Sequence, residues 1–429
     1  MKLILLFSFL LLFYGYNYGR SVNESSMGNN DSSSTSHVEK KDTIMPHVDN
    51  QNEKIKTPQK DLLDVVRGIF HPKTNPVLND DQLRRDTKMH FSILPAVGYS
   101  LQTGFAGLIS GNMAFYSDTI TNTKISSVNS SITYSQYNQI ILPLQANLWS
   151  KGNRINFISD FRYIKYPTNI YSLGGPNEPN TSYNINFLGI KLHQTVLKSL
   201  ANNLYIGVGY YYDHFFNIEP KDEVPDNIAK NVIADMGKKE SASGPVFRLL
   251  YDSRLNQINP QQGVYYNITF RTSERALGSD SNWTSIQIDS RAYLQFPKRS
   301  GNVLAFWMFD WLTAGGTPPY LLLPSTGWDD SYNTGRGYVQ SRFRGKSMAY
   351  FETEYRYHIS RNGLVGGVVF VNMETFSGDI SPVYSQLYPG YGLGIRLMAN
   401  KFSRANVCID YGFGEKGSGG FFVNIGEVF

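Results

Sequence analysis

From about residue 88 onward, apolar and polar side chains alternate along the chain with a period of two. The clearest stretch is 347–360, where apolar residues share one face and charged or polar residues share the other: Ala349, Phe351, Tyr355, Tyr357 and Ile359 against Glu352, Glu354, Arg356 and His358. Successive side chains of a β-strand point to opposite faces, so this period predicts strands. One apolar and one charged face predict the wall of a membrane barrel, with lipid outside and a wet lumen inside.

Two further segments repeat the pattern. In 282–298 the two faces carry Ile286, Ile288, Ala292, Leu294 and Phe296 against Gln287, Asp289, Arg291 and Gln295. In 301–313 they carry Val303, Trp307, Phe309 and Trp311 against Asn302 and Asp310. We expect the apolar set of each segment to meet lipid and the polar set to line the lumen.

The whole alternating region divides into sixteen such segments, separated by turn residues. Their expected spans are 88–100, 104–117, 124–136, 138–150, 154–166, 181–197, 203–219, 242–253, 263–275, 282–298, 301–316, 347–360, 363–377, 390–402, 405–415 and 419–429. The sequence therefore predicts an all-β fold: a transmembrane antiparallel β-barrel of about 16 strands over residues 88–429, preceded by a disordered N-terminal segment.

The connections between these segments support a barrel in an outer membrane. Such barrels have short periplasmic turns and longer external loops in strict alternation. If both ends of the barrel lie in the periplasm, the four longest connections all follow odd-numbered strands and all lie outside: 167–180, 220–241, 317–346 and 378–389. The turn 254–262 is then the longest on the periplasmic side.

The N-terminus has the features of a secretory signal peptide over residues 1–20. Lys2 precedes an apolar run of twelve residues, and the small residues Gly15 and Gly19 follow. The alternative is an uncleaved membrane anchor. After residue 20 no apolar run reaches eighteen residues, so membrane insertion has to use strands.

Residues 21–87 are expected to form a disordered periplasmic segment. Residues 21–60 are rich in Ser, Asn, Lys and Asp and bury too little apolar surface to offset chain entropy. Residues 61–70 place Leu62, Val65, Val66, Ile69 and Phe70 at helix-like spacing, which predicts a short amphipathic helix. A transient helix in a linker is the alternative.

Composition agrees with a barrel and excludes other classes. Aromatic residues make up 14% of the chain and charged residues only 17%, where soluble proteins have about a quarter charged residues. The net charge of +5 is not concentrated in a basic helix, so we expect no nucleic-acid partner. Cys408 is the single cysteine, so no intrachain disulfide forms.

No catalytic or metal-binding set emerges from the spacing of candidate residues. The seven histidines contain no H-E-x-x-H motif and no ligand-like cluster, and His214 and His358 are expected in the barrel wall. The glycine-rich run 412–420 leads into a strand and not a helix, which makes it a turn and not a phosphate loop. We therefore expect no cofactor, no metal and no enzymatic activity; a barrel enzyme acting on lipids is the remaining alternative.

The last predicted strand, 419–429, carries a pattern typical of outer-membrane sorting signals. Phe421, Val423, Ile425 and the final Phe429 share one face, with Glu427 interrupting it. This pattern predicts a signal that the barrel-assembly machinery reads.

Four groups of residues resemble the BamA/TamA insertase superfamily, also called the bacterial surface antigen family, over roughly residues 90–429. They are Pro95, Gly98, Tyr99, Gly104 and Gly107 at the barrel start; Asp252, Arg254, Asn259, Pro260 and Gly263 in a D-x-R…N-P…G turn; Arg336, Gly337 and Tyr338 as an R-G-F/Y loop tip; and the closing segments Gly392–Arg396 and Asp410–Gly414. The resemblance is to the barrel module alone.

The resemblance implies that the loop 317–346 folds back into the lumen, where its arginine meets acidic side chains of the inner wall. The loop-lock motif here is Arg336, Gly337 and Tyr338, and the candidate lumenal partners are Glu352, Glu354 and Glu374, all inward by alternation. A buried arginine needs a carboxylate partner. Where the family often has F-x-D, this chain has Phe370-Val371-Asn372, and Asn372 cannot supply an ionic partner. The alternative is that Arg336 is a solvated loop residue.

The family resemblance implies a role in outer-membrane protein assembly or translocation, in the outer membrane of a Gram-negative bacterium. The implied partners are outer-membrane lipid, barrel-assembly components and client outer-membrane proteins. Insertases of the family carry POTRA domains before the barrel, whereas residues 21–87 lack the strands and apolar content of one. The alternative is therefore a non-catalytic barrel that scaffolds an envelope complex or acts as a lipid or solute channel.

Overall fold

The structure is a computed structural model that describes residues 59–62, 64–65, 68, 87–100, 103–119, 123–171, 173, 182–221, 237–378 and 386–429. Contacts along the chain separate a unit of residues 59–429, which holds the strands described below, from a unit of residues 1–58. The predicted signal peptide (1–20) and most of the predicted disordered segment (21–87) lie outside the described residues.

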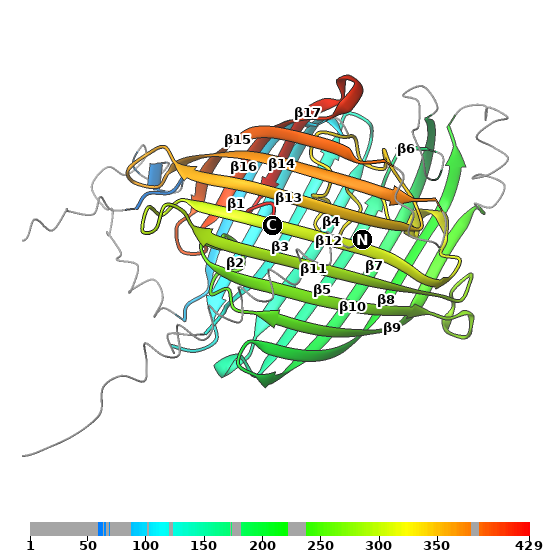
Figure 1. The fold of residues 1–429 in the computed structure, drawn as a ribbon, viewed down its shortest axis with the longest axis horizontal. Coiled ribbons are helices and arrows are strands. Elements are labelled where there is room, and N and C mark those ends of the chain that lie inside the picture. Colours follow the sequence, from blue (N-terminus) through cyan, green and yellow to red (C-terminus); the bar gives the residue numbers. More distant parts are fainter. Residues whose placement is uncertain are drawn as a thin grey trace, which may run out of the picture. The chain divides into compact units, whose positions relative to one another are not determined.

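Among the described residues, seventeen strands form the fold, joined in one antiparallel sheet (Figure 1). They are β1 (His90–Ser100), β2 (Gly104–Tyr116), β3 (Ile125–Ser135), β4 (Ile140–Trp149), β5 (Ile155–Lys165), β6 (Thr168–Ile170), β7 (Tyr183–Ala201), β8 (Leu204–Pro220), β9 (Lys239–Asp252), β10 (Gly263–Ser273), β11 (Trp283–Gln295), β12 (Val303–Gly316), β13 (Ser347–His358), β14 (Val365–Ser377), β15 (Tyr388–Asn400), β16 (Ala405–Phe413) and β17 (Gly419–Ile425).

The number of strand positions agrees with the prediction of about sixteen. Both β5 and β6 pair with β7, so β6 continues β5 past Tyr166 and Pro167, and the seventeen strands fill sixteen positions. Proline lacks the N–H that a ladder needs, which fits a break at this point. The all-β fold with sixteen antiparallel positions is thus confirmed, and the strand ends that the four long connections join lie at one end because neighbouring strands alternate in direction.

The predicted alternation holds around most of the sheet. Apolar side chains on one face are exposed, such as Val369 at 47% on β14 and Leu393 at 59% on β15, as expected for a surface that meets lipid. The charged side chains of β13, Glu352, Glu354 and Arg356, are buried on the other face. We call that other face the lumenal face.

Strand β12 reverses the expectation for its two faces. Val303, Trp307 and Phe309 are buried on the lumenal face, and Asp310, predicted to be lumenal, lies on the outer face between Met308 and Leu312. The prediction was wrong because it assumed a wet lumen. The lumen beside β12 is filled with protein, so this wall presents aromatic side chains inward.

Asp310 is a carboxyl group within an otherwise apolar outer strip, opposite Ala349 of β13 and Ile288 of β11. We expect Asp310→Leu to stabilise the barrel by about 1 kcal/mol, because an ionisable group facing lipid is unfavourable. The free energy of unfolding in lipid vesicles, from urea titration, measures this. Asp118→Leu, in the turn after β2, is the matched control, and an unchanged or lower stability of Asp310→Leu contradicts the expectation.

The helix predicted at 61–70 is present among the described residues at Leu62, Asp64, Val65 and Gly68. Asp61 accepts a hydrogen bond from the Lys401 backbone N–H at 2.9 Å, and the Asp64 carboxylate pairs with the Lys401 ammonium at 2.8 Å. The segment therefore docks on the turn between β15 and β16. Among the described residues, no helical segment has the length and apolar character that crossing a membrane requires.

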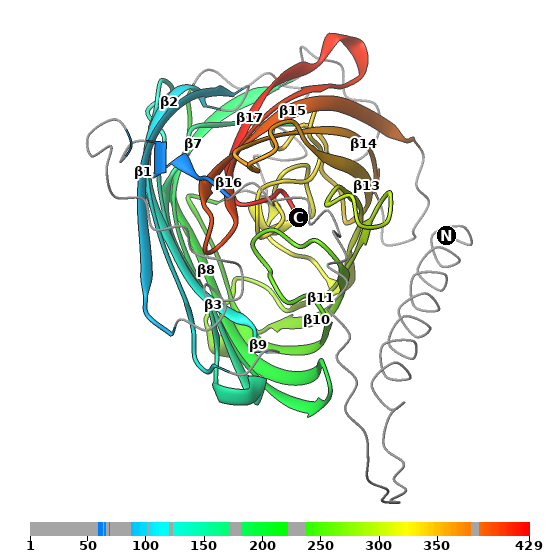
Figure 2. The ribbon, with the colours of Figure 1, turned by 90° about the vertical axis from the view of Figure 1, so that its left-hand side faces the viewer.

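The last strand is shorter than predicted. It ends at Ile425, and Gly426 turns the chain out of the sheet with a φ of +92°. Residues 426–429 then run inward, so that the final residues lie inside the ring of strands together with the loop between β12 and β13 (Figure 2). We call residues 426–429 the tail.

Candidate functional site

The loop between β12 and β13, residues 317–346, packs against two opposite parts of the wall. Near its start, the backbone N–H groups of Tyr320 and Leu321 donate to the Glu240 carboxylate of β9 at 3.1 and 2.9 Å. An apolar cluster joins the same part of the loop to β5–β9: Leu321, Leu322, Leu323 and Trp328 against Ile164, Ile170, Ile185, Phe187, Phe215 and Ala242. The loop is therefore anchored inside the barrel and is not a solvated external loop.

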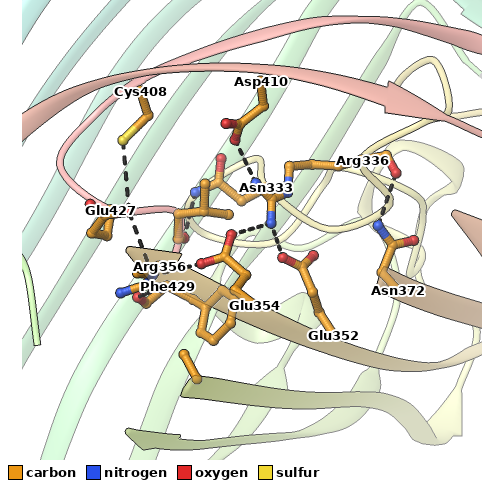
Figure 3. A network of polar contacts seen from close by, with 12 residues as sticks. Asn333, Arg336, Glu352, Glu354, Arg356, Asn372, Cys408, Asp410, Glu427 and Phe429 are labelled. Carbon is orange, nitrogen blue, oxygen red and sulfur yellow. Dashed lines mark hydrogen bonds and ion pairs between the residues drawn. The ribbon is translucent and has the colours of Figure 1, made fainter. Parts of the chain in front are cut away.

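The tip of the loop carries a buried arginine held by three carboxylates. The Arg336 guanidinium is ion-paired with Glu352 and Glu354 of β13, and with Asp410 of β16 at 2.5 Å (Figure 3). Its Cζ atom also lies 3.7 Å from the ring centre of Phe370 on β14. The structure thus brings together three strands around one loop side chain.

Arg336 remains charged in this position. Burial alone lowers the pKa of a guanidinium, but Glu352, Glu354 and Asp410 outweigh it and hold the pKa of Arg336 well above its ordinary value. The Arg336 side chain is 1% exposed and surrounded by three carboxylates, so it is held in place. Withdrawing it would leave these carboxylates buried in the lumen without a cation. The arrangement can lock the loop to the wall.

The predicted partners are only partly those observed. Glu352 and Glu354 contact Arg336, whereas the Glu374 carboxylate accepts a hydrogen bond from Thr326 at 3.0 Å and not from Arg336. Glu374 points inward as predicted, but it lies opposite Tyr350. It is therefore two residues beyond the level of Glu352, towards the end of the barrel where the loop 317–346 joins β13. Alternation gives the direction of a side chain and not its height relative to a loop.

Asp410 is the partner that sequence reasoning missed. The D-Y-G motif and the inward alternation shared with Cys408 were the available signals. Asn372 stands where the family motif often has an aspartate, and it contacts the loop in another way. Its side-chain amide donates a hydrogen bond to the Arg336 backbone carbonyl at 2.9 Å. Asp410 supplies the charge and Asn372 holds the backbone.

Gly337 and Tyr338 complete the loop tip. Gly337 has a φ of +116°, and a Cβ there would lie 2.6 Å from the Phe413 carbonyl oxygen, so only glycine fits. The Tyr338 hydroxyl donates to the Pro389 carbonyl at 2.6 Å and accepts from the Glu415 N–H at 3.0 Å. Burial raises the pKa of Tyr338 to about 12, so the hydroxyl keeps the proton it donates.

The closing motif Gly392–Arg396 makes room for the same site. A Cβ on Gly394 would lie 1.8 Å from an Asp410 carboxylate oxygen, so any larger residue displaces the partner of Arg336. Arg396, two residues further, is ion-paired with Asp410 and donates from Nε to Glu427 at 2.9 Å. The R-G-Y, G-x-G-x-R and D-Y-G motifs therefore converge on one place.

The residues of the predicted sorting signal do not share one face. Phe421 is 42% exposed on the outer face and Val423 and Ile425 are partly exposed there, but Phe429 is buried in the lumen. The prediction of a single continuous strand was wrong because Gly426 ends it. Glu427 accordingly faces the lumen, where Arg396 and Arg356 outweigh the effect of burial and hold its pKa below the ordinary value.

The D-x-R…N-P…G turn, residues 253–262, joins distant parts of the sheet. Lys124 donates from Nζ to the Asp252 and Arg254 carbonyls at 2.6 and 2.7 Å. Asn256 donates to the Ser403 carbonyl at 3.0 Å, and the Ile258 carbonyl accepts from the Glu427 N–H at 3.1 Å. The turn thus reaches from β9 and β10 to the β15–β16 turn and the tail.

One junction of the sheet differs from all the others. Within the described residues, β1 forms a ladder with β2 alone and β17 with β16 alone, although a Cβ built on Gly98 of β1 lies only 3.7 Å from the Val423 Cβ of β17. We call this junction the seam. Near the start of β1, the ring of His90 stacks on Phe402, in the β15–β16 turn, at 3.6 Å.

The chain matches a known protein family over most of its length. A model of the Omp85 superfamily domain matches residues 126–429, which confirms the resemblance seen in the motifs. No curated protein sequence matches the chain.

Several solved structures are similar at low identity. BamA from Haemophilus ducreyi lacking POTRA domains 1–3 has 14% identity and a TM-score of 0.46, covering 79% of this chain and 69% of that one. CdiB from Acinetobacter baumannii has 12% identity and a TM-score of 0.48, covering 83% and 70%; CdiB from Escherichia coli has 10% and 0.49, covering 81% and 69%. The assignment rests on the domain match: the chain belongs to the Omp85 superfamily, whose barrels are outer-membrane proteins of Gram-negative bacteria that insert or translocate proteins.

Proposed function

We propose that this barrel takes part in the assembly of outer-membrane proteins or in their translocation, and that the seam between β1 and β17 receives the client strand. The observation that carries the proposal is the missing ladder at the seam, since every other junction of the sheet is hydrogen-bonded. An unpaired strand edge is a template for adding another strand.

The exposure of β1 supports this reading of the seam. Its outward side chains Val97 and Ile93 are 82% and 70% exposed, well above the 47% of Val369 on the fully paired β14. In lipid, unpaired backbone groups are costly, so an edge of this kind favours a partner strand. The side-chain contacts of the β15–β16 turn with the start of β1, where His90 stacks on Phe402, hold the seam together when no client is present.

The lumen argues against the alternative of an open solute channel. The loop 317–346 and the tail occupy it, and their side chains Trp328, Tyr338 and Phe429 are all buried. The competing hypothesis is a scaffold function, in which client proteins are assembled elsewhere. We propose barrel-assembly components and client outer-membrane proteins as the partners of this barrel.

A disulfide across the seam tests the proposal. The variant Gly98→Cys with Val423→Cys, in a Cys408→Ser background, places two Cβ atoms about 3.7 Å apart, within the range of a disulfide. We expect the oxidised variant to lose outer-membrane protein assembly in a strain depleted of the native protein, and reduction to restore it. Client barrels in the outer membrane are quantified after depletion.

A control pair separates seam locking from cysteine chemistry. Phe247→Cys with Phe270→Cys joins directly opposite residues of β9 and β10, which already form a ladder, so its oxidation should leave assembly unchanged. Normal levels of every client barrel with the seam fully oxidised would rule out client entry at this junction and favour the scaffold.

A further inference from the structure

The lock around Arg336 is part of a larger closed ring of charges that includes the tail. Beyond Arg336, the Asp410 carboxylate pairs with Arg396, and Arg396 pairs with Glu427 at 2.9 Å. Arg356 closes the ring, at 2.7 Å from Glu354 and 3.6 Å from Glu427. Each of these side chains is at most 7% exposed, so the ring links the loop tip to the tail through short, poorly screened contacts. Figure 3 shows the part of the ring around Arg336, Glu354 and Asp410.

The tail also makes ring-stacking contacts and hydrogen bonds outside the charge ring. The Phe429 ring stacks on Trp307 of β12 at 5.3 Å, and its carbonyl accepts from Arg356 at 3.0 Å. Asn333 of the loop donates to the Val428 carbonyl at 2.7 Å. Asn406 of β16 donates to the Glu427 carboxylate at 2.6 Å.

These contacts contrast with the weak attachment of β17 itself. The strand has seven residues and a ladder on one side alone, towards β16. Its end is continuous with the tail, so the tail contacts limit how far β17 can move relative to β1. A strand held on one edge and at one end moves when that end is released.

We propose that Glu427 and Phe429 form a latch that positions the seam strand β17, and that the charge ring couples the latch to the loop 317–346. Both are positioning residues, because they act on the seam through β17. The relevance of this latch to client entry rests on the proposed function; the coupling itself does not.

The direction of the coupling follows from the sharing of partners. Asp410 and Glu354 each divide their interaction between Arg336 and a second arginine, Arg396 or Arg356. When Arg336 leaves, these two carboxylates draw the second arginines away from Glu427. Release of the loop therefore loosens the tail, and loosening of the tail weakens the hold on the loop.

Hydrogen exchange of the full-length folded protein in lipid nanodiscs tests the latch. In Glu427→Gln we expect the amides of residues 419–425 to exchange faster by on the order of tenfold, because a charge-assisted contact is lost while the shape of the side chain is kept. Amides of β9 and β10 should be unchanged. Glu415→Gln, an exposed carboxylate in the turn between β16 and β17, is the matched control.

Two further variants keep the test decisive if Glu427→Gln folds poorly. Asn333→Ala removes the contact of the loop with the Val428 carbonyl without changing charge, and should speed exchange of 419–425 by a smaller factor. Arg336→Lys should speed exchange of the same segment, and its combination with Glu427→Gln should add less than the two single effects together.

Unchanged exchange of residues 419–425 in Glu427→Gln and Asn333→Ala overturns the latch, and additive effects of Arg336→Lys and Glu427→Gln overturn the coupling. This readout does not depend on clients. Faster exchange together with unimpaired assembly in the seam-disulfide experiment leaves the latch standing and rejects the proposed function.

Discussion

Replacing Arg336 by alanine is expected to destabilise the barrel by about 3 to 5 kcal/mol, because it leaves buried carboxylates without their shared cation. Glu352 has no other arginine partner among the described residues, and it also accepts a hydrogen bond from the Tyr350 hydroxyl. The free energy of unfolding, followed by tryptophan fluorescence during urea titration in detergent, measures the loss. Trp328 lies in the same loop and should report loop release at lower urea than the rest.

A lysine at position 336 should recover only part of this stability. Its ammonium is a point charge and cannot serve three carboxylates at once as the guanidinium does. Arg361→Ala, at an exposed turn between β13 and β14, is the control and should change stability by less than about 0.5 kcal/mol. If Arg336→Ala behaves like Arg361→Ala, the loop is not locked by charge.

The second large effect is expected for Trp307→Ala, at about 3 to 5 kcal/mol of lost stability. Trp307 is 1% exposed, its indole N–H donates to Asp289 at 3.0 Å, and its ring contacts Tyr350 and Phe429 at 5.1 and 5.3 Å between ring centres. Removing it opens a cavity between β12 and the tail. The same urea titration measures the change.

The neighbouring residue provides the contrast. Phe306 lies on the outer face of β12. In a lipid vesicle, Phe306→Ala replaces a ring that contacts lipid by a methyl group that contacts lipid. It should therefore lower stability much less than Trp307→Ala. Equal losses for the two variants would mean that Trp307 does not face a packed lumen. Trp307→Phe should retain the stacking on Phe429 and lose mainly the bond to Asp289.

Much of this architecture is determined by the sequence alone. A period of two with turn residues between segments fixes the strands to within a few residues, because the alternation is a local property of extended backbone. The position of the long loop and the inward direction of Glu352 and Glu354 follow from the same local counting, whereas the R-G-Y tip was identified by its resemblance to the family motif. The family motifs add the expectation that the loop lies in the lumen.

Where the loop and the tail fill the lumen, only the tertiary structure decided which face of a strand meets lipid. On β12 both faces are largely apolar, and alternation cannot tell Trp307 facing protein from Trp307 facing lipid. The same limit assigned Asp310 to the wrong side. The choice depends on the loop and tail that fill the lumen, which are distant in sequence.

The partner set of Arg336, the inward turn of the tail and the open seam were likewise decided by the tertiary structure. Asp410 and Arg336 are 74 residues apart, and their meeting depends on the register of β13–β16 and on the path of the loop. A single left-handed glycine, Gly426, redirects Phe429 from the outer face into the lumen. Local patterns give the direction of each side chain, but which side chains meet depends on long-range registers that no local pattern carries.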